Sequence, residues 1–169
     1  MATISEIKNR LAALRKQMQV HQLSAFIVPS TDPHSGEYVP EHWESRKWIS
    51  GFTGSAGTAV ITLEDAGLWT DSRYFIQAEE QLAGTGIRLF KDRLPETPSI
   101  TEWLGSILKE GERVGIDGWV NSHQEAAGIR QELKASGLEL ETMTDDIFDT
   151  IWENRPSLPK TPVSILHEN

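Results

Sequence analysis

The sequence predicts an α/β fold, a three-layer sandwich around a mixed sheet of about six strands. Short apolar stretches alternate with longer segments whose apolar residues recur every three or four positions, and this alternation of strands with helices is typical of α/β domains. Two of the apolar stretches flank a short glycine-containing segment that suits a β-hairpin. Because a hairpin is antiparallel and helical crossovers join parallel strands, the sheet is predicted to be mixed.

The composition is that of one folded domain. A chain of 169 residues can bury a substantial core. It contains no cysteine, which excludes disulfides and thiolate metal sites and fits a reducing compartment. The formal net charge of -9 disfavours nucleic acid and anionic membranes as partners. Since the first residues also lack a signal-peptide pattern, the sequence predicts a soluble, cytoplasmic protein.

Six helices are predicted from apolar periodicity and from residues that cap helix ends. Three begin with a capping box, a Ser or Thr followed three residues later by Glu: Thr3–Glu6, Ser99–Glu102 and Ser122–Glu125. A short helix is expected to end at Gly51, because glycine readily adopts the left-handed conformation that terminates helices. The predicted helices cover residues 4–18, 43–50, 73–82, 100–108, 123–133 and 145–152.

The strands are predicted at short apolar stretches rich in β-branched residues. They are residues 25–28, 58–63, 68–70, 87–90, 113–117 and 138–143. Residues 64–67, Glu-Asp-Ala-Gly, form the predicted hairpin turn. The segment 29–40 is rich in Pro, Ser, Asp and Gly and is predicted to be a long loop, a kind that is uncommon unless it carries function.

A glycine run, Gly51-Phe-Thr-Gly54-Ser-Ala-Gly57, precedes the second predicted strand. It invites a nucleotide-binding interpretation, but phosphate loops place their glycines between a strand and the start of a helix. Here a helix precedes the glycines, a strand follows them, and the spacing is G-x-x-G-x-x-G. We therefore favour a tight helix-to-strand crossing in which backbone segments approach closely.

Other polar residues could be metal ligands or catalytic groups, and each has a structural alternative. Asp32, His34 and Glu37 could hold a metal, but no zinc-site spacing completes them, so a polar surface loop is favoured. The pair Asp145 and Asp146 suits a helix N-cap better than a carboxylate dyad. The sequence predicts no catalytic residue and no metal ligand in this chain.

The tryptophans are expected in two kinds of place. Trp48, Trp103 and Trp152 fall on apolar faces and are predicted to lie in the core. Trp43 and Trp119 lie near loop boundaries, where an exposed ring would indicate a surface for a partner.

The run Asp71-Ser-Arg73-Tyr-Phe lies where a predicted strand ends and a helix begins. Strand ends are where α/β folds place ligand contacts. From the residues alone, however, the favoured interpretation is that Asp71 or Ser72 caps the helix and Arg73 makes a structural ion pair.

Four blocks of the sequence occur in a characteristic order: residues 31–38, 50–61, 69–75 and 151–156. Taken together, they resemble the N-terminal domain of the Xaa-Pro aminopeptidases, the aminopeptidase P family, which shares its architecture with creatinase and prolidase. The chain looks most like the long, multi-domain cytosolic type, in which a second similar domain and a C-terminal catalytic domain follow. The resemblance therefore implies a creatinase N-terminal fold and a chain that is part of a longer enzyme.

The resemblance also implies an activity for that longer enzyme. Such enzymes release the N-terminal residue from peptides with proline second, using two divalent metal ions, usually manganese, held by the C-terminal domain. No cofactor is then expected in this chain. The implied partners are proline-containing peptides, the downstream domains and a second copy in a homodimer, with no nucleic acid and no membrane. This domain would wall the active site, limit peptide access and help assembly.

Arg73 is the one residue to which a family role can be transferred. In the family, the arginine of the D-x-R-Y-F run reaches toward the substrate cleft, so the resemblance implies that Arg73 binds substrate. Ser72 departs from the glycine that many relatives have there. Two alternatives stay open: the N-terminal domain of a prolidase-like or creatinase-like enzyme, and a free-standing, non-catalytic binding or oligomerisation module.

The predicted domain covers residues 1–155. Beyond it, Pro156, Pro159 and Pro162 recur every three residues without apolar periodicity, which is typical of an extended linker. Residues 156–169 are therefore predicted to lead toward missing downstream domains, with a merely ragged C-terminus as the alternative.

Overall fold

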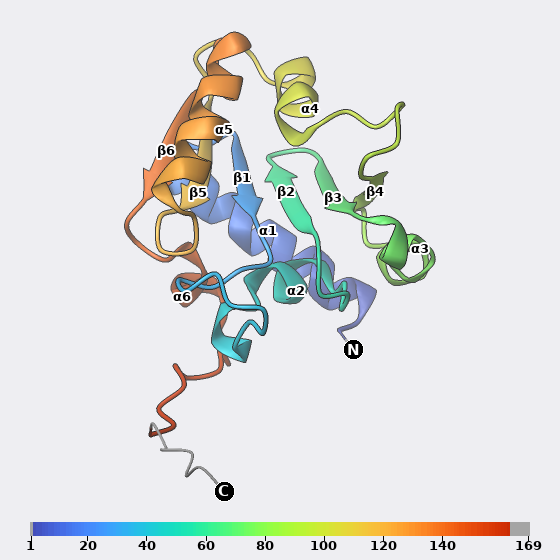
Figure 1. The fold of residues 1–169 in the computed structure, drawn as a ribbon, viewed down its shortest axis with the longest axis vertical. Coiled ribbons are helices and arrows are strands. Elements are labelled where there is room, and N and C mark those ends of the chain that lie inside the picture. The colour runs from blue at the N-terminus through green and yellow to red at the C-terminus, as the bar shows by residue number, and fades with distance from the viewer. Residues whose placement is uncertain (1, 163–169) are drawn as a thin grey trace, which may run out of the picture.

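The chain forms three layers, with a six-stranded sheet between two layers of helices (Figure 1). The structure is a computed structural model that describes residues 2–162. Across the sheet the strands follow the order β4-β3-β2-β1-β5-β6. They are β1 (Ala25–Val28), β2 (Thr58–Thr62), β3 (Ala66–Thr70), β4 (Arg88–Lys91), β5 (Arg113–Asp117) and β6 (Glu139–Met143). The predicted α/β sandwich with a mixed sheet is confirmed.

The direction of the strands brings most of their ends to one edge of the sheet. β2 is antiparallel to both β1 and β3, whereas the pairs β1–β5, β5–β6 and β3–β4 are parallel. Every strand except β2 therefore ends at the same edge, which we call the carboxyl edge. Polar loops that follow different strands meet there.

The β2–β3 hairpin is confirmed, but its predicted turn is wrong in position. Residues 63–65 connect the two strands, and Gly67 lies inside β3 opposite Val60. A side chain at Gly67 would come within 2.7 Å of the rings of Trp69 and Phe90. The glycine thus makes room for packed rings on the sheet rather than for a turn.

Helices cover both faces of the sheet (Figure 1). One layer contains α1 (Ile4–Val20), α2 (Ser45–Ser50), α3 (Phe75–Leu82) and α6 (Ile147–Ile151), and the other contains α4 (Ile100–Ile107) and α5 (His123–Ala135). Each layer of helices packs on its own hydrophobic core, and β1 contributes to both. Phe26 packs into the core beneath the first layer and Ile27 into the core beneath the second. None of the helices within residues 2–162 is long and apolar enough to cross a membrane.

The helix ends follow local sequence closely. All three predicted capping boxes are present, at Thr3–Glu6, Ser99–Glu102 and Ser122–Glu125. α2 ends as predicted at Gly51, whose φ is 73°. The starts of α2 and α3 are wrong by a few residues, because two short 3-10 helices, η1 (Glu41–Trp43) and η2 (Ser72–Tyr74), take up the residues before them.

The tryptophans divide differently from the prediction. Trp103 is buried as predicted, beside the stacked rings of Trp69 and Phe90. Trp48 and Trp152 are only half-buried and stack on each other, with ring centroids 5.1 Å apart. Trp48 lies in α2 and Trp152 directly follows α6, so the stacked rings join an early and a late segment of the domain. The Trp48 ring packs against the core and against Arg10, and the Trp152 ring packs against Arg155.

Trp119 is 62% exposed at the carboxyl edge, in the position where an exposed ring would indicate a partner surface. Residues 156–162 of the predicted linker form no helix or strand. Residues 163–169 of that linker lie outside the described residues, as does Met1. The domain boundary after Arg155 stays a prediction.

Candidate functional site

Two segments at the carboxyl edge form the candidate site: the glycine run 51–57, which enters β2, and residues 71–74, which leave β3. Between them they bring together backbone carbonyls, hydroxyls and the Arg73 guanidinium. The long loop 29–40, which leaves β1, adjoins the same edge (Figure 1).

The glycine run is held from beneath by Arg46 of α2, which is only 4% exposed. Its two terminal nitrogens donate to the backbone carbonyls of Phe52 and Gly54, and its Nε donates to Ser30 Oγ at 2.7 Å. Ser30 in turn donates to the carbonyl of Gly57 at 2.6 Å. Burial lowers the pKa of Arg46 to about 10, so the side chain stays charged at neutral pH. One guanidinium and one hydroxyl thus fix three carbonyls of the run.

The glycines are needed because the run is closely packed. A Cβ on Gly54 would lie 2.3 Å from Phe52 Cζ and 2.8 Å from Tyr74 Cδ1. A Cβ on Gly57 would lie 2.9 Å from the backbone oxygen of Trp69. The predicted close approach of backbone segments is therefore confirmed.

The glycine run is also fastened to the segment that carries Arg73. Ser55 Oγ and the Tyr74 hydroxyl lie 2.7 Å apart and share a hydrogen bond. The Thr53 N–H donates to Gln81 Oε1 of α3 at 2.9 Å, and the rings of Phe52 and Tyr74 meet edge to face at 5.9 Å. A continuous set of contacts therefore leads from buried Arg46 to the turn at residues 72–74.

Arg73 itself is exposed, with 67% of its side chain accessible to solvent. Its Nε and Nη2 donate to the two carboxylate oxygens of Asp71 at 2.9 and 2.8 Å, and its backbone N–H donates to the same Asp71 side chain. These hydrogen bonds lower the pKa of Asp71 to about 2 and raise the pKa of Arg73. The predicted cap and ion pair are confirmed, whereas substrate binding by Arg73 stays a prediction.

The geometry leaves Arg73 able to bind a further group. Its Nη1 makes no hydrogen bond to any residue that the structure describes, and the guanidinium carbon lies 5.3 Å from the centroid of the Tyr74 ring. A guanidinium that is oriented by one carboxylate can still donate to an incoming carbonyl or carboxylate. The ion pair therefore orients Arg73 without covering it.

Two hollows flank this segment. A cleft of 510 Å³ lies between α4 and α5 and is lined by Asp71, Asp92 and Glu125 over an apolar floor that includes Trp69. A smaller hollow of 220 Å³ lies between the loop 29–40 and the glycine run, and Ser55 lines it. The glycine run borders both hollows, with Gly57 at the larger and Gly54 at the smaller, and Asp71 lines the larger one.

The comparisons with known proteins agree with this architecture. Residues 10–149 match the family model of the Creatinase/Prolidase N-terminal domain. The chain belongs to this family. It is 42% identical over 167 residues to Xaa-Pro aminopeptidase 2 of Homo sapiens and 42% identical over 166 residues to Xaa-Pro aminopeptidase ApepP of Drosophila melanogaster. These alignments cover 98% and 96% of this chain but 24% and 27% of the relatives, so the chain spans about a quarter of their length.

A solved relative has the same fold along almost all of the chain. It is the X-prolyl aminopeptidase of Caenorhabditis elegans, a cytosolic enzyme with a di-nuclear active site, with a TM-score of 0.85 and 31% identity. The superposition covers 99% of this chain and 28% of that chain. A creatinase/prolidase-like N-terminal domain from Corynebacterium diphtheriae has the same fold with a TM-score of 0.59 and 24% identity.

The polar loop of this creatinase/prolidase-type domain is organised by Asp32. Asp32 is only 4% exposed, and its Oδ1 accepts the backbone N–H groups of His34 at 2.7 Å and Gly36 at 3.2 Å. Its carboxylate is therefore used to order the loop, and Glu37 is exposed to solvent. The structure does not bring Asp32, His34 and Glu37 together as ligands.

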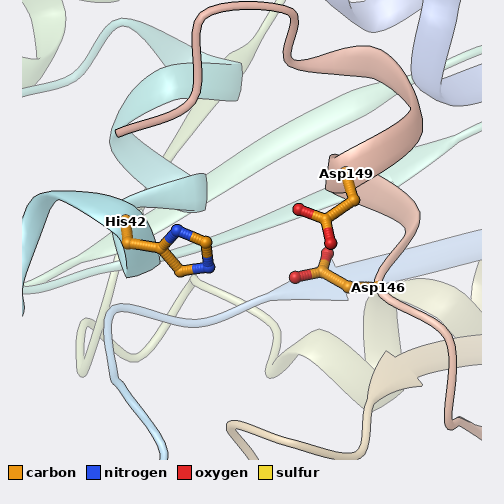
Figure 2. Close-up of side chains that lie close together, drawn as sticks. All are labelled: His42, Asp146 and Asp149. Carbon is orange, nitrogen blue, oxygen red and sulfur yellow. The ribbon is translucent and has the colours of Figure 1, made fainter. Parts of the chain in front are cut away.

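A different group of potential ligands was not predicted from the sequence. Within residues 2–162 one such group has its ligand atoms within 4.8 Å of one another, and it consists of His42, Asp146 and Asp149 (Figure 2). The two carboxylates already bind a cation, because Arg155 Nη1 lies 2.6 Å from each. Asp146 also caps α6, as predicted for the Asp145–Asp146 pair.

Asp117, at the end of β5, is another residue that sequence reasoning missed. It is 8% exposed, and burial raises the pKa of its carboxyl to about 6, although the donated N–H of Trp119 opposes this shift. An aspartate that follows an apolar strand is common, so nothing in the local sequence distinguishes it. The apolar stretch before it was the only available signal.

Proposed function

We propose that this chain is the N-terminal domain of a metal-dependent Xaa-Pro aminopeptidase, which releases the N-terminal residue from peptides with proline in second position. The observation that carries the proposal is the 42% identity to Xaa-Pro aminopeptidase 2 over 98% of this chain. A separate support is the fold shared with the C. elegans enzyme at a TM-score of 0.85.

In this proposal the domain is non-catalytic. It walls the active site, limits peptide access and helps assembly, while two divalent metal ions, manganese in our proposal, act in the downstream catalytic domain. Among residues 2–162 the one candidate ligand group does not fit such a centre, because its two carboxylates already hold the Arg155 guanidinium. The proposed partners are the peptide substrate, the downstream domains and a second copy of the enzyme, in the cytoplasm, without nucleic acid or membrane.

Arg73 is the proposed substrate-binding residue. Its exposed guanidinium offers planar donors for a carbonyl or carboxylate of the peptide, a geometry that a lysine ammonium reproduces poorly. The Asp71 carboxylate and the Tyr74 ring hold it in place. Arg73 would thus act by positioning the peptide rather than by bond chemistry.

Substituting Arg73 in the longer enzyme tests this role. We expect Arg73→Ala to reduce kcat/KM for an Xaa-Pro peptide by about 10-fold to 1,000-fold, the effect of losing one charged hydrogen bond. Arg73→Lys should recover part of the loss. Metal content and melting temperature should stay unchanged, since Arg73 is exposed.

Arg88→Ala provides the matched control, because Arg88 is also exposed, weakly paired with Asp65 at 4.0 Å, and placed at the start of β4, away from the carboxyl edge. It should leave kcat/KM unchanged. Normal turnover by Arg73→Ala with a lower melting temperature would instead make Arg73 a purely structural ion-pair residue.

The family model also names creatinase and prolidase, so a prolidase-like or creatinase-like parent is the second candidate. Comparing a dipeptide, a longer peptide with proline second, and creatine as substrates of the longer enzyme separates these activities. Hydrolysis of none of them, with metal bound, would favour a free-standing binding or oligomerisation module.

A further inference from the structure

The end of the domain is joined to an early part of the chain by four residues, His42, Asp146, Asp149 and Arg155, which we call the exit clamp. His42 lies in η1, the two aspartates lie at the start of α6, and Arg155 follows α6. In Figure 2 the His42 imidazole and the two carboxylates are turned toward one another. The clamp sits where the chain leaves the domain.

Arg155 is the centre of the clamp and is almost fully buried, with 6% of its side chain exposed. Its Nη1 lies 2.6 Å from Asp146 Oδ2 and 2.6 Å from Asp149 Oδ1. Its Nε donates to the backbone carbonyl of His42 at 3.0 Å. A buried guanidinium with two carboxylates and a carbonyl is costly to release, because release leaves these groups unpaired.

His42 fastens the next residue of the exit. Its Nδ1 lies 2.7 Å from the backbone oxygen of Pro156, and since a carbonyl can only accept, Nδ1 is the donor. The contacts of His42 with Arg155 and Pro156 span 113 and 114 positions in the sequence. Two consecutive residues of the exit are therefore bonded to the same residue of η1.

Aromatic rings extend the clamp into the domain. The guanidinium carbon of Arg155 lies 5.5 Å from the ring centroid of Trp43 and 5.7 Å from that of Trp152. Trp152 stacks on Trp48 of α2. The guanidinium carbon of Arg10, in α1, lies 4.8 Å from the centroid of the Trp48 ring. Arg155 Nη2 is buried without a hydrogen-bond partner among the described residues, and the neighbouring rings supply a cation–π attraction.

We propose that the exit clamp makes the connection after Arg155 a rigid joint, which fixes where and in which direction the chain from Pro156 onward leaves this domain. The joint therefore holds the first residue of the predicted linker, Pro156, against the domain. The predicted linker would then be extended but not free at its first residue. The inference concerns this chain alone and does not depend on the proposed peptidase activity.

The absence of cysteine allows the joint to be tested with spin labels. Cysteines replace Lys16, exposed on α1, and Ser157, exposed just after the clamp, and pulsed electron paramagnetic resonance measures the distance distribution between the labels. We expect a narrow distribution in the otherwise unchanged chain. Arg155→Ala should broaden and shift it, and the backbone amides of residues 152–155 should exchange faster with solvent.

A milder variant and a control guard against general unfolding. Asp149→Asn removes one charge from the clamp at a side chain that is 67% exposed, so it should fold and broaden the distribution less than Arg155→Ala. Arg88→Ala, an exposed arginine far from the clamp in sequence, should leave it narrow. A broad distribution in the unchanged chain, or equal widths in Asp149→Asn and the unchanged chain, would overturn the proposal.

Adding Mn²⁺ tests whether the exit clamp is instead a metal site. We expect Mn²⁺ to change neither the distance distribution nor the melting temperature, because the Arg155 guanidinium already lies between the two carboxylates and occupies the place of a cation. Stoichiometric Mn²⁺ binding that Asp146→Asn abolishes would show that a metal displaces Arg155, and would overturn the proposed joint.

Discussion

Arg46 and Arg73 lie at opposite ends of one set of contacts, yet their environments are reversed. Arg46 is 4% exposed, and its donors go to two backbone carbonyls and a serine hydroxyl. Arg73 has 67% of its side chain in solvent and is paired with Asp71. Burial lowers the pKa of Arg46, whereas the Asp71 carboxylate raises the pKa of Arg73.

The difference separates support from recognition. A buried guanidinium that satisfies fixed carbonyls cannot turn toward a ligand without leaving them unpaired. An exposed guanidinium with one carboxylate partner can bind a further group at little cost, since surface ion pairs are weak. Arg46 should therefore affect stability and Arg73 should affect binding.

The largest expected loss of stability follows from replacing Arg46. We expect Arg46→Met to lower the free energy of unfolding by about 3 kcal/mol, because the carbonyls of Phe52 and Gly54 lose their buried donors. Arg73→Met should change it by less than about 0.5 kcal/mol, as for other exposed side chains. Chemical denaturation of the two variants measures both values, and equal effects would end the distinction between the two arginines.

The glycine run that links the two arginines gives an intermediate effect. Gly54→Ala should cost about 2 kcal/mol, because the new methyl group overlaps the rings of Phe52 and Tyr74. Gly128→Ala in α5 is the control, since among residues 2–162 no atom beyond the chain neighbours and the backbone of α5 itself lies within 4 Å of its Cβ position, and it should stabilise the protein by about 0.5–1 kcal/mol. Thermal or chemical unfolding would show the opposite signs, and a neutral Gly54→Ala would mean that the run is not tightly packed.

Burial and pairing with an arginine shift the pKa values of two aspartates in opposite directions. The folded-state pKa of Asp117 is raised to about 6, above the usual value of about 3.9. The protonated carboxyl therefore stabilises the fold at low pH, and this stability is lost as the pH rises through about 6. The pKa of Asp71 is lowered to about 2, so its ion pair stabilises above about pH 4 and is lost as the pH falls toward 2.

Asp117→Asn should therefore raise the free energy of unfolding at neutral pH by about 1 kcal/mol. It should also reduce the fall in the free energy of unfolding between about pH 4 and pH 6. Unfolding free energies measured across this range check the prediction. Asp71→Asn should show no such gain, because its carboxylate is stabilised rather than penalised in the fold. A steeper decline with pH in Asp117→Asn would show that burial does not control this carboxyl.

Interactions within a few residues of sequence determined much of this protein. Helix ends depend on side chains and backbone groups that are already neighbours in the chain. Examples are the capping boxes that begin at Thr3, Ser99 and Ser122 and the end of α2 at Gly51. The alternation of strands and helices then fixed the fold class. The Asp71–Arg73 ion pair was also predictable, because its partners are two positions apart.

Only the tertiary structure decided the rest, since the groups involved meet only after folding. Gly67 lies inside β3 because rings from β3 and β4 require the space. Arg46 reaches Ser30 across 16 positions, and His42 reaches Arg155 across 113. An arginine in the sequence is equally compatible with solvent, a ligand or a buried carbonyl, and its burial in the fold selects among them.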